Sequence, residues 1–454
     1  MFEGVPTPPA MHRRRFASTA LSALGALALA PARAGARAVR GYAGPPAVDG
    51  ARLNADLAAL AQFGRTDAGG VSRVAYSEAD RQGRAWMMER MRTAGLAVRV
   101  DAAGNIWGRR AGRDAARAPI VFGSHIDSVP DGGRFDGTVG SLGALEVVRT
   151  LAAHGIVTTH PLDVVVFQNE EGGTVGSRAL VGEVSAADLA LPTRSGKAIG
   201  EGIAFIGGDV ARLGEARRAP DSIAAYVELH IEQGGTLEAE GRDIGVVEGI
   251  VGIGWWDVTI TGFQNHAGTT AMDKRQDAML AAARFADMVN RVVTSVPGRQ
   301  VGTVGRLQAF PGAPNVIPGK VVCSLELRDL EAAKQAMLFA RIRAEAEAIG
   351  RATGTTFAYV NTHDSAPALC APRVMQAVED AAHARGLTTK RLPSGAGHDA
   401  QHMAKLCPSG MIFIPSIGGI SHAPAEFSRP ADIAHGADVL LSTVLDLDAA
   451  LARP

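Results

Sequence analysis

The sequence has few cysteines and few aromatic residues, and it carries no excess of charge of either sign. Only three cysteines occur in 454 residues, and none belongs to a Cys-x-x-Cys pair. An odd and scattered set argues against a full disulfide framework and favours three small buried side chains, although one pair could still form a bridge. Aromatic residues make up 5% of the chain, whereas glycine occurs 54 times, which suits an α/β protein with many tight turns.

The balance of charge narrows the functional classes further. The 46 Lys and Arg residues match the 46 Asp and Glu residues. No basic stripe indicates nucleic-acid binding, and no acidic block indicates a disordered tail. A Gly-x-Ser-x-Gly elbow is also missing, so a serine hydrolase is not expected. The length allows more than one domain and a large core.

Residues 1–38 are expected to form an export signal. Three arginines, Arg13 to Arg15, precede a mildly apolar run at 17–32, and small-x-small sites follow. This order resembles a twin-arginine-type signal peptide, which predicts a periplasmic protein with no stable membrane span after cleavage. This apolar run is too short and too rich in alanine for a membrane span. A disordered basic tail or an uncleaved anchor is the alternative.

Strand and helix patterns alternate through most of the remaining chain. Buried strands are expected at 119–124, 162–168, 224–229 and 411–415, and helices at 48–62, 142–154 and 371–385. Ser77 is expected to cap a further helix that stops at Gly95. Residues 172–220 suggest only short helices and loops. Strand, helix, strand is the order of a mostly parallel sheet, so the fold class is α/β.

A different pattern occupies residues 249–364. Strands are expected at 255–261, 300–310, 320–328 and 355–361, with helices at 275–293 and 331–349, the second stopping at Gly350. This β-α-β-β-α-β order is the ferredoxin-like arrangement. We therefore expect a ferredoxin-like domain inserted between the two segments of a larger domain, 39–248 and 365–454.

Ligand-type side chains lie just after four apolar runs. They are His125 with Asp136, Glu170 with Glu171, His230 and His422. Carboxyl ends of parallel strands meet at one edge of a sheet, so these side chains should lie together. His, Asp and Glu without Cys suit a nitrogen and oxygen site, and one carboxylate, naturally Asp136, can bridge two metals. Merely solvated loop residues are the alternative.

Three acidic residues have distinct expected roles at this edge. Asp127 follows His125 by two residues and could orient its imidazole through its carboxylate. Glu170 and Glu171 are adjacent and should point in different directions. One of them can bind metal while the other acts as general base, unless the pair is simply a solvated turn.

Eight segments carry a resemblance to a known family. They are Gly-Ser-His-Ile-Asp at 123–127, Gly-Gly-Arg-Phe-Asp-Gly at 132–137, Asn-Glu-Glu-Gly at 169–172, Glu-Leu-His-Ile-Glu-Gln-Gly at 228–234, Asn-His-Ala-Gly-Thr-Thr at 265–270, Pro-Asn-Val-Ile-Pro at 314–318, Ser-Gly-Ala-Gly-His-Asp-Ala at 394–400 and Gly-Ile-Ser-His-Ala-Pro-Ala-Glu at 419–426. The chain resembles the di-zinc amidohydrolases of the M20 peptidase superfamily. The similarity is greatest to the branch of N-carbamoyl-L-amino-acid hydrolases, β-ureidopropionases and allantoate amidohydrolases.

The resemblance implies roles for individual residues. One metal would take His125, Asp136 and His230, and the second would take Asp136, Glu171 and His422, with Glu170 as general base. Zinc is the expected metal, with manganese, cobalt or nickel as alternatives. The implied substrate-binding set is Gln233, His266, Asn315, Arg328 and the loop of Gly395, Ala396, Gly397 and His398.

Two of these residues suit their implied chemistry. The Arg328 fork can bind a substrate carboxylate, unless it is a surface ion pair with Asp329 or a neighbour. His266 could donate to a developing oxyanion, and in the family it reaches the partner subunit's active site, so a homodimer is implied. It would otherwise be an ordinary loop histidine.

The expected activity is hydrolysis of a linear amide or ureido C–N bond in a small carboxylate, such as an N-carbamoyl amino acid or allantoate. An M20-type exopeptidase or aminoacylase is the alternative enzyme, and an exported binding protein is the alternative class. The chain departs from the family after Gly172, where only three residues precede Gly176 and Ser177 in place of a longer loop. The shorter loop bears on the size of the substrate.

Overall fold

The computed structural model describes residues 46–453. The expected signal peptide, 1–38, lies outside the described residues. The described residues belong to one compact unit. None of the described helices has the length and the apolar character needed to cross a bilayer.

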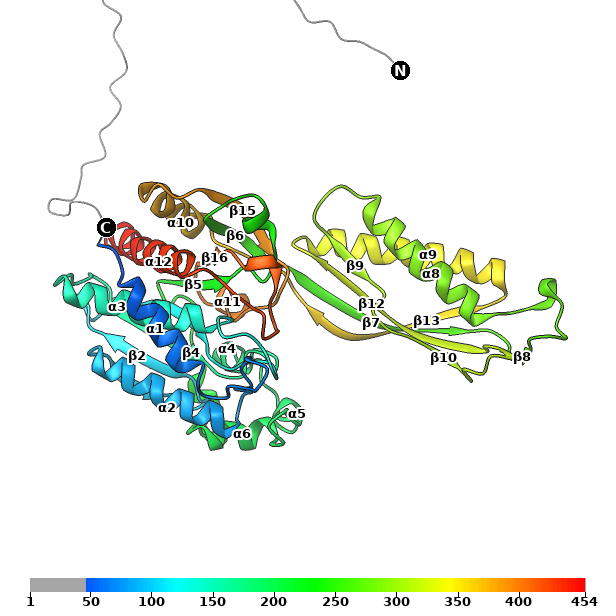
Figure 1. Cartoon of the computed structure of the whole chain (residues 1–454), viewed down its shortest axis with the longest axis horizontal. Coiled ribbons are helices and arrows are strands. Elements are labelled where there is room, and N and C mark those ends of the chain that lie inside the picture. The colour runs from blue at the N-terminus through cyan, green and yellow to red at the C-terminus, as the bar shows by residue number, and fades with distance from the viewer. Residues whose placement is uncertain (1–45, 454) are drawn as a thin grey trace, which may run out of the picture. The chain divides into compact units, whose positions relative to one another are not determined.

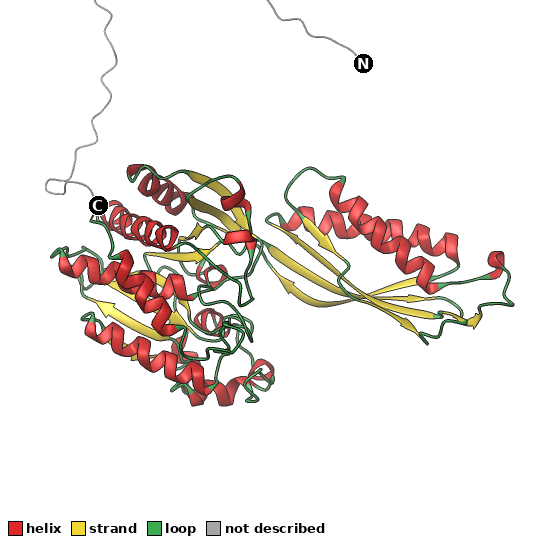
Figure 2. Cartoon of the chain, in the orientation of Figure 1, coloured by secondary structure: helices red, strands yellow, loops and turns green. Residues whose placement is uncertain are grey.

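A nine-stranded sheet forms the larger part of the fold (Figures 1 and 2). Its strand order is β1-β2-β4-β3-β5-β16-β6-β14, and β15 pairs with β6. Its strands are β1 (Ala97–Val100), β2 (Ile106–Arg110), β3 (Ile120–His125), β4 (Leu162–Phe167), β5 (Ala225–Ile231), β6 (Ile244–Ile250), β14 (Ala368–Leu369), β15 (Thr389–Ser394) and β16 (Ser409–Ile414). The central neighbours β4, β3, β5 and β16 are mutually parallel. The prediction of a mixed α/β fold with a mostly parallel sheet is confirmed.

Helices cover both faces of this sheet. The longer ones are α1 (Gly50–Leu60), α2 (Glu78–Thr93), α3 (Thr138–Ala153), α10 (Pro372–Ala384) and α12 (Pro430–Leu451). They share one hydrophobic core with β3, β4, β5 and β16. Shorter elements pack on the opposite face or run over it: α4 (Val175–Val181), α5 (Ala186–Leu189), α6 (Ile199–Phe205), α7 (Thr236–Ala239), α11 (Ala400–Met403) and the 3₁₀ segments η1 (Val210–Ala216) and η3 (Ile417–Gly419). Strands buried on both faces explain the continuous apolar runs in the sequence.

A second, antiparallel sheet is built from the segment between β6 and β14. Its strands are β7 (Gly252–Thr261), β9 (Val301–Thr303), β10 (Leu307–Phe310), β12 (Lys320–Asp329) and β13 (Thr356–Ser365), in the order β10-β12-β7-β13 with β9 on β12. Helices α8 (Ala278–Thr294) and α9 (Ala332–Thr353) share its core. The buried residues of α8 recur at helical spacing and form one apolar stripe. A two-stranded sheet, β8 (Asn265–His266) with β11 (Val316–Ile317), and η2 (Met272–Lys274) complete the segment.

Several boundaries differ from the sequence-based expectations. Helix α9 runs through Gly350 and ends before Gly354, which has a φ of 66°. A Cβ at Gly350 would lie 2.7 Å from the carbonyl oxygen of Thr355, so this glycine permits close packing and does not stop the helix. The expected strand at 300–310 is interrupted between β9 and β10. Strands β6 and β15 and helix α12 had not been predicted.

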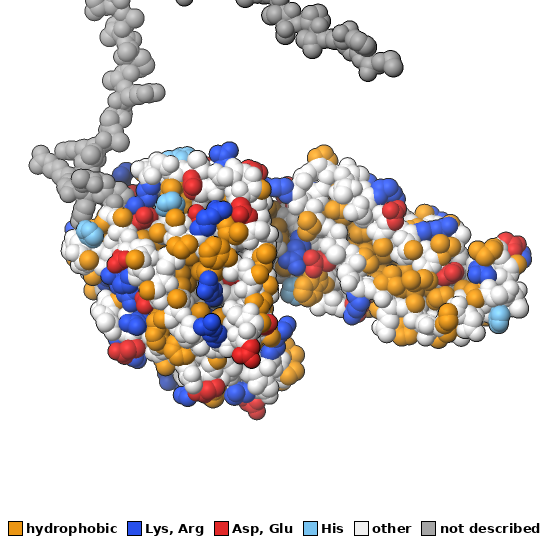
Figure 3. All heavy atoms as spheres, in the orientation of Figure 1, with side chains coloured by type: hydrophobic (Ala, Val, Ile, Leu, Met, Phe, Trp, Pro, Cys, Tyr) orange, Lys and Arg blue, Asp and Glu red, His pale blue; other side chains and the backbone are white. Residues whose placement is uncertain are grey.

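The three cysteines are buried and free, as expected of small apolar side chains, and the bridge left open by the sequence does not form. On the face drawn in Figure 3, acidic and basic side chains are interspersed, in keeping with the balanced composition.

Candidate active site

Ends of neighbouring parallel strands bring the predicted ligands to one edge of the nine-stranded sheet. His125 is the last residue of β3, and His230 lies within β5, one residue before its end. Both histidines were expected just beyond their strands, so the strands are slightly longer than predicted. Glu170 and Glu171 follow β4, whereas His422 lies in the loop between η3 and α12.

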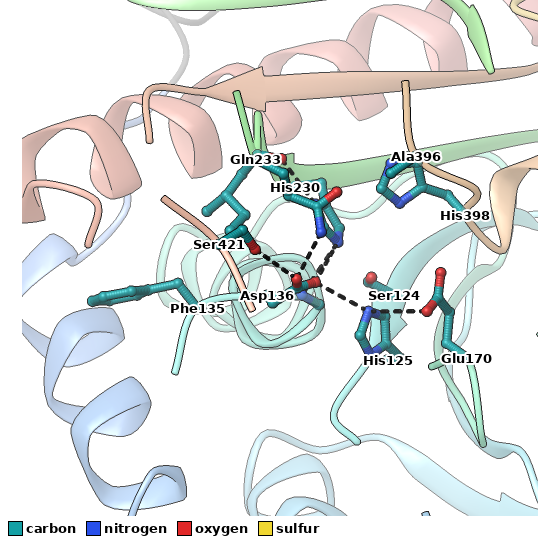
Figure 4. Close-up of polar contacts among 12 residues, drawn as sticks. Ser124, His125, Phe135, Asp136, Glu170, His230, Gln233, Ala396, His398 and Ser421 are labelled. Atoms are coloured by element: carbon teal, nitrogen blue, oxygen red, sulfur yellow. Dashed lines mark hydrogen bonds and ion pairs between the residues drawn. The ribbon is translucent and has the colours of Figure 1, made fainter. Parts of the chain in front are cut away.

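Asp136 lies at the centre of this cluster, as Figure 4 shows. Its Oδ1 is 3.6 Å from Nε2 of His125 and 3.2 Å from Nε2 of His230, and its Oδ2 is 3.2 Å from Nε2 of His422. Gly137 makes this approach possible. Its φ is 64°, and a Cβ there would lie 2.3 Å from Nε2 of His125.

Backbone carbonyls orient the two buried imidazoles. Nδ1 of His125 lies 3.0 Å from the carbonyl oxygen of Asp127, and Nδ1 of His230 lies 2.9 Å from that of Ile231. With Nδ1 as the donor in each ring, the Nε2 lone pair is directed toward Asp136. Both rings are therefore arranged as metal ligands.

The expected role of Asp127 needs correction. Its carboxylate lies 3.6 Å from Nδ1 of His125, farther than its own carbonyl oxygen. The carboxylate oxygens instead accept hydrogen bonds from the backbone N–H groups of Glu170 and Glu171, each at 3.2 Å. The turn after β4 leaves these N–H groups without strand partners, and Asp127 satisfies them. It thus fixes the position of both glutamates.

The second set of ligand atoms comes from Asp136, Glu171 and His422. Oε1 of Glu171 is 3.6 Å from Nε2 of His422. Gln233 and Ser421 also donate to Oδ2 of Asp136, at 2.7 and 3.0 Å. The two glutamates diverge, since Oε2 of Glu170 lies 3.9 Å from Nε2 of His125, on the other side of the centre.

Burial and close charges shift the proton affinities of the cluster. Burial would raise the pKa of Asp136, but its interactions with the imidazoles of His125, His230 and His422 hold that pKa well below its usual range. The hydrogen bond with Asp136 raises the pKa of His422 to about 9. Burial and the neighbouring Asp136 raise the pKa of Glu171 to about 7, and burial raises that of Glu170 well above its usual range.

These residues fit a pair of divalent cations. His125, Asp136 and His230 form one group whose ligand atoms lie within 4.8 Å of one another, and Asp136, Glu171 and His422 form another. Within residues 46–453, the buried Oε1 of Glu171 has no hydrogen-bond partner. Nitrogen and oxygen donors that share one carboxylate are the ligands of two-metal hydrolytic centres.

A cavity of about 960 Å³ opens beside the cluster. Five residues of the implied substrate set and of its loop line it, namely Gln233, Arg328, Ala396, Gly397 and His398. Arg328 donates to Glu326 at 2.7 Å and to the carbonyl oxygen of Gly395 at 2.6 Å. Its ion-pair partner is thus Glu326, whereas Asp329 pairs with Lys334.

His266 and Asn315 do not line this cavity in the same chain. His266 is exposed on β8 and pairs with Val316, the residue after Asn315, on β11. The two residues therefore lie together, away from the cluster.

The short loop after Glu171 leads into α4, and Thr174 contacts Nε2 of His402 at 2.9 Å. His402 is held outside both ligand groups.

Sequence reasoning missed two carboxylates that support the centre. Oε1 of Glu426 accepts hydrogen bonds from the backbone N–H groups of Phe135 and Asp136, at 2.9 and 3.1 Å. Glu228 accepts from Ser124 and Tyr226, at 2.7 and 2.9 Å, and its carboxylate lies within 4.8 Å of a ring nitrogen of His230. Both acids lie within the family motifs quoted above, so those motifs could have identified them.

The model of the peptidase family M20/M25/M40 matches residues 121–446. The chain belongs to the peptidase family M20/M25/M40. The resemblance drawn from the sequence motifs is thereby confirmed.

Named relatives of this M20 family member include an N-carbamoyl-L-amino acid amidohydrolase of Geobacillus stearothermophilus. The two are 42% identical over 405 residues, which cover 88% of this chain and 99% of the relative. A ureidoglycolate hydrolase of Arabidopsis thaliana is 36% identical, with 88% and 87% covered. The solved structure of a hydantoinase/carbamoylase family amidase from Burkholderia ambifaria superposes with a TM-score of 0.82, at 38% identity and coverage of 89% and 98%.

Proposed function

We propose that this protein is a metal-dependent amidohydrolase that cleaves the C–N bond of an N-carbamoyl-L-amino acid. The observation that carries the proposal is the shared cavity. The Asp136, Glu171 and His422 group and Arg328 line the same cavity, so one small molecule could contact both. The relatives named as amidohydrolases of N-carbamoyl-L-amino acids agree with this substrate class.

The five ligand residues would hold two divalent ions. Zinc is the expected metal, and manganese, cobalt or nickel are the alternatives. When bound, such ions polarise a carbonyl group and lower the pKa of water. Glu170 lies at the edge of the cluster with a side chain 10% exposed, where it can take a proton from an attacking water. It would then return this proton to the leaving nitrogen.

Substrate binding is assigned to side chains that line the cavity. Arg328 would exchange its bond to Glu326 for the substrate carboxylate, because a guanidinium fork pairs well with a carboxylate. Gln233 and the loop of residues 395–398 would position the ureido group. Hydrolysis yields the free amino acid and carbamate, which breaks down to carbon dioxide and ammonia.

The proposal also covers the segment 249–364 and its assembly. We assign residues 39–248 and 365–454 to a catalytic domain, and 249–364 to an inserted ferredoxin-like domain that acts as a lid and forms a homodimer. Exposed His266, remote from its own cluster, would then reach a neighbouring subunit. The twin-arginine-type signal at 1–38 supports a periplasmic location.

A substrate screen of the metal-loaded protein tests the proposal. Ammonia release would be followed with N-carbamoyl-L-amino acids, their D enantiomers, allantoate and ureidoglycolate, and free amine release with dipeptides and N-acetyl amino acids. N-carbamoyl-L-amino acids are expected to give the highest kcat/KM. Faster turnover of dipeptides or N-acetyl amino acids would favour the exopeptidase or aminoacylase and overturn the assignment.

A further inference from the structure

A cluster of positive charge outside the candidate active site lies at the outer edge of the nine-stranded sheet. Arg99 on β1 is directly opposite Trp107 on β2, and its guanidinium lies 5.4 Å from the centre of the indole ring. Arg218, which follows η1, lies 5.1 Å from the same ring. Two cationic groups therefore share one nearly buried aromatic side chain.

These side chains line a cavity of about 310 Å³, together with Arg109 and Asp163. None of its lining residues belongs to the cavity of the candidate active site. It is thus a separate site with its own chemistry.

Nearby carboxylates are already engaged. Asp163 forms a two-point pair with Arg109, with both distances at 2.7 Å. Asp101 accepts hydrogen bonds from the indole N–H of Trp107 at 2.7 Å and from the side chain of Asn105 at 3.1 Å. Both acids thereby hold the walls of the cavity, and neither forms an ion pair with Arg99 or Arg218.

The charges of Arg99 and Arg218 therefore remain available to a ligand. Among residues 46–453, neither arginine forms an ion pair, and Nε of Arg218 is buried without a hydrogen-bond partner. Burial and the charge of Arg99 lower the pKa of Arg218. Two like charges that line one cavity without carboxylate partners favour an anion there.

We propose that this cavity binds a small oxyanion, a phosphate or carboxylate group, between Arg99 and Arg218. Guanidinium groups donate two parallel hydrogen bonds to such an anion, which Arg99 and Arg218 would supply from the groups that face the cavity. Trp107 forms the floor of the site, fixed by its bond to Asp101. Arg109, neutralised by Asp163, forms the rim.

Titration of the full-length protein with inorganic phosphate tests this proposal. Binding is measured by calorimetry and by tryptophan fluorescence at low ionic strength, and succinate serves as the carboxylate ligand in a parallel titration. Saturable binding of at least one anion is expected, and the tighter anion identifies the ligand class. Arg99→Gln and Arg218→Gln should each weaken binding about 10-fold, the effect of losing hydrogen bonds to a charged group.

Two controls separate this site from others. Arg90 lies 5.0 Å from the ring of Trp86 outside the cavity, so Arg90→Gln should leave binding unchanged. Asp136→Asn disrupts the candidate metal centre and should also leave it unchanged. Arg99 is exposed, so its variant is expected to fold even if the Arg218 variant does not. The proposal would be overturned if neither anion bound saturably. It would also be overturned if Arg90→Gln weakened anion binding as much as the Arg99 and Arg218 variants do, or if Asp136→Asn weakened it.

Discussion

Glu426 accepts a hydrogen bond from the backbone N–H of Asp136 at 3.1 Å, and this bond links the loop that carries His422 to the turn that carries the central carboxylate. Gly133 leaves room for the contact, since a Cβ there would lie 1.9 Å from Oε1 of Glu426. Glu426 also accepts from Ser421, which itself donates to Asp136. The acid therefore positions Asp136 without belonging to either ligand group.

Glu426→Gln should weaken metal binding by about 10-fold or more, as expected when a group that orients a ligand is altered. The amide cannot accept both backbone N–H groups as strongly as a carboxylate. Metal titration measures the affinity. Glu238→Gln is a matched control, because Glu238 accepts from the backbone of Gly418 in the same region and lies outside the ligand groups. Equal metal affinity of Glu426→Gln and wild type would contradict the positioning role.

His422→Ala should reduce the metal content from two ions to one per chain, with loss of most activity. The variant removes one of three residues from the Asp136, Glu171 and His422 group and leaves the other group intact. Elemental analysis of the purified protein checks the content. His402→Ala provides the comparison, because His402 lines the same cavity but belongs to neither group. Retention of two ions by His422→Ala would refute the assignment.

Glu170→Gln should retain its metal while turnover falls by roughly 10²-fold or more, because shape is kept and the proton acceptor is lost. Glu171→Gln should instead lower metal affinity. Steady-state kinetics combined with metal analysis separates the two effects. The reverse pattern would exchange the roles of the two glutamates.

Acid stability should depend on His402. Burial lowers the pKa of His402 to about 4. Because this pKa lies below the ordinary value of about 6.5, the contribution of neutral His402 to the free energy of unfolding is complete above about pH 6.5. It is lost as the pH falls toward 4, by at most about 3 kcal/mol. His402→Gln should therefore flatten the decline in melting temperature over that range. If the melting temperature of the variant declined with pH as in wild type, His402 would not be the cause of the decline.

Mixed subunits test the action of His266 across an interface. Glu170→Gln and His266→Ala should each be inactive alone. After subunit exchange, a heterodimer would contain one site that lacks both groups and one intact site, so about half of wild-type activity per heterodimer should return. Exchange shown by tagged subunits, without recovery of activity, would exclude a role for His266 in the neighbouring site.

The sequence by itself determined the local pattern of this protein. Fully apolar runs that end in His, Asp or Glu predicted buried parallel strands with ligand residues at one edge, because strand burial and side-chain chemistry are local properties. The α/β class and the order of elements in 249–364 followed from the same periodicities. Gly350 shows the limit, since only packing against Thr355 explains a glycine inside α9.

Tertiary structure decided how those residues act together. The sequence placed the carboxylate of Asp127 next to His125, but the fold offers the closer backbone carbonyl to the ring and turns the carboxylate to the amides of Glu170 and Glu171. Likewise, Arg328 meets the carbonyl oxygen of Gly395 across 67 residues, and Glu426 meets the backbone N–H of Asp136 across 290 residues. Such contacts depend on the relative placement of distant segments, which hydrophobic packing of the whole chain sets and no local pattern records.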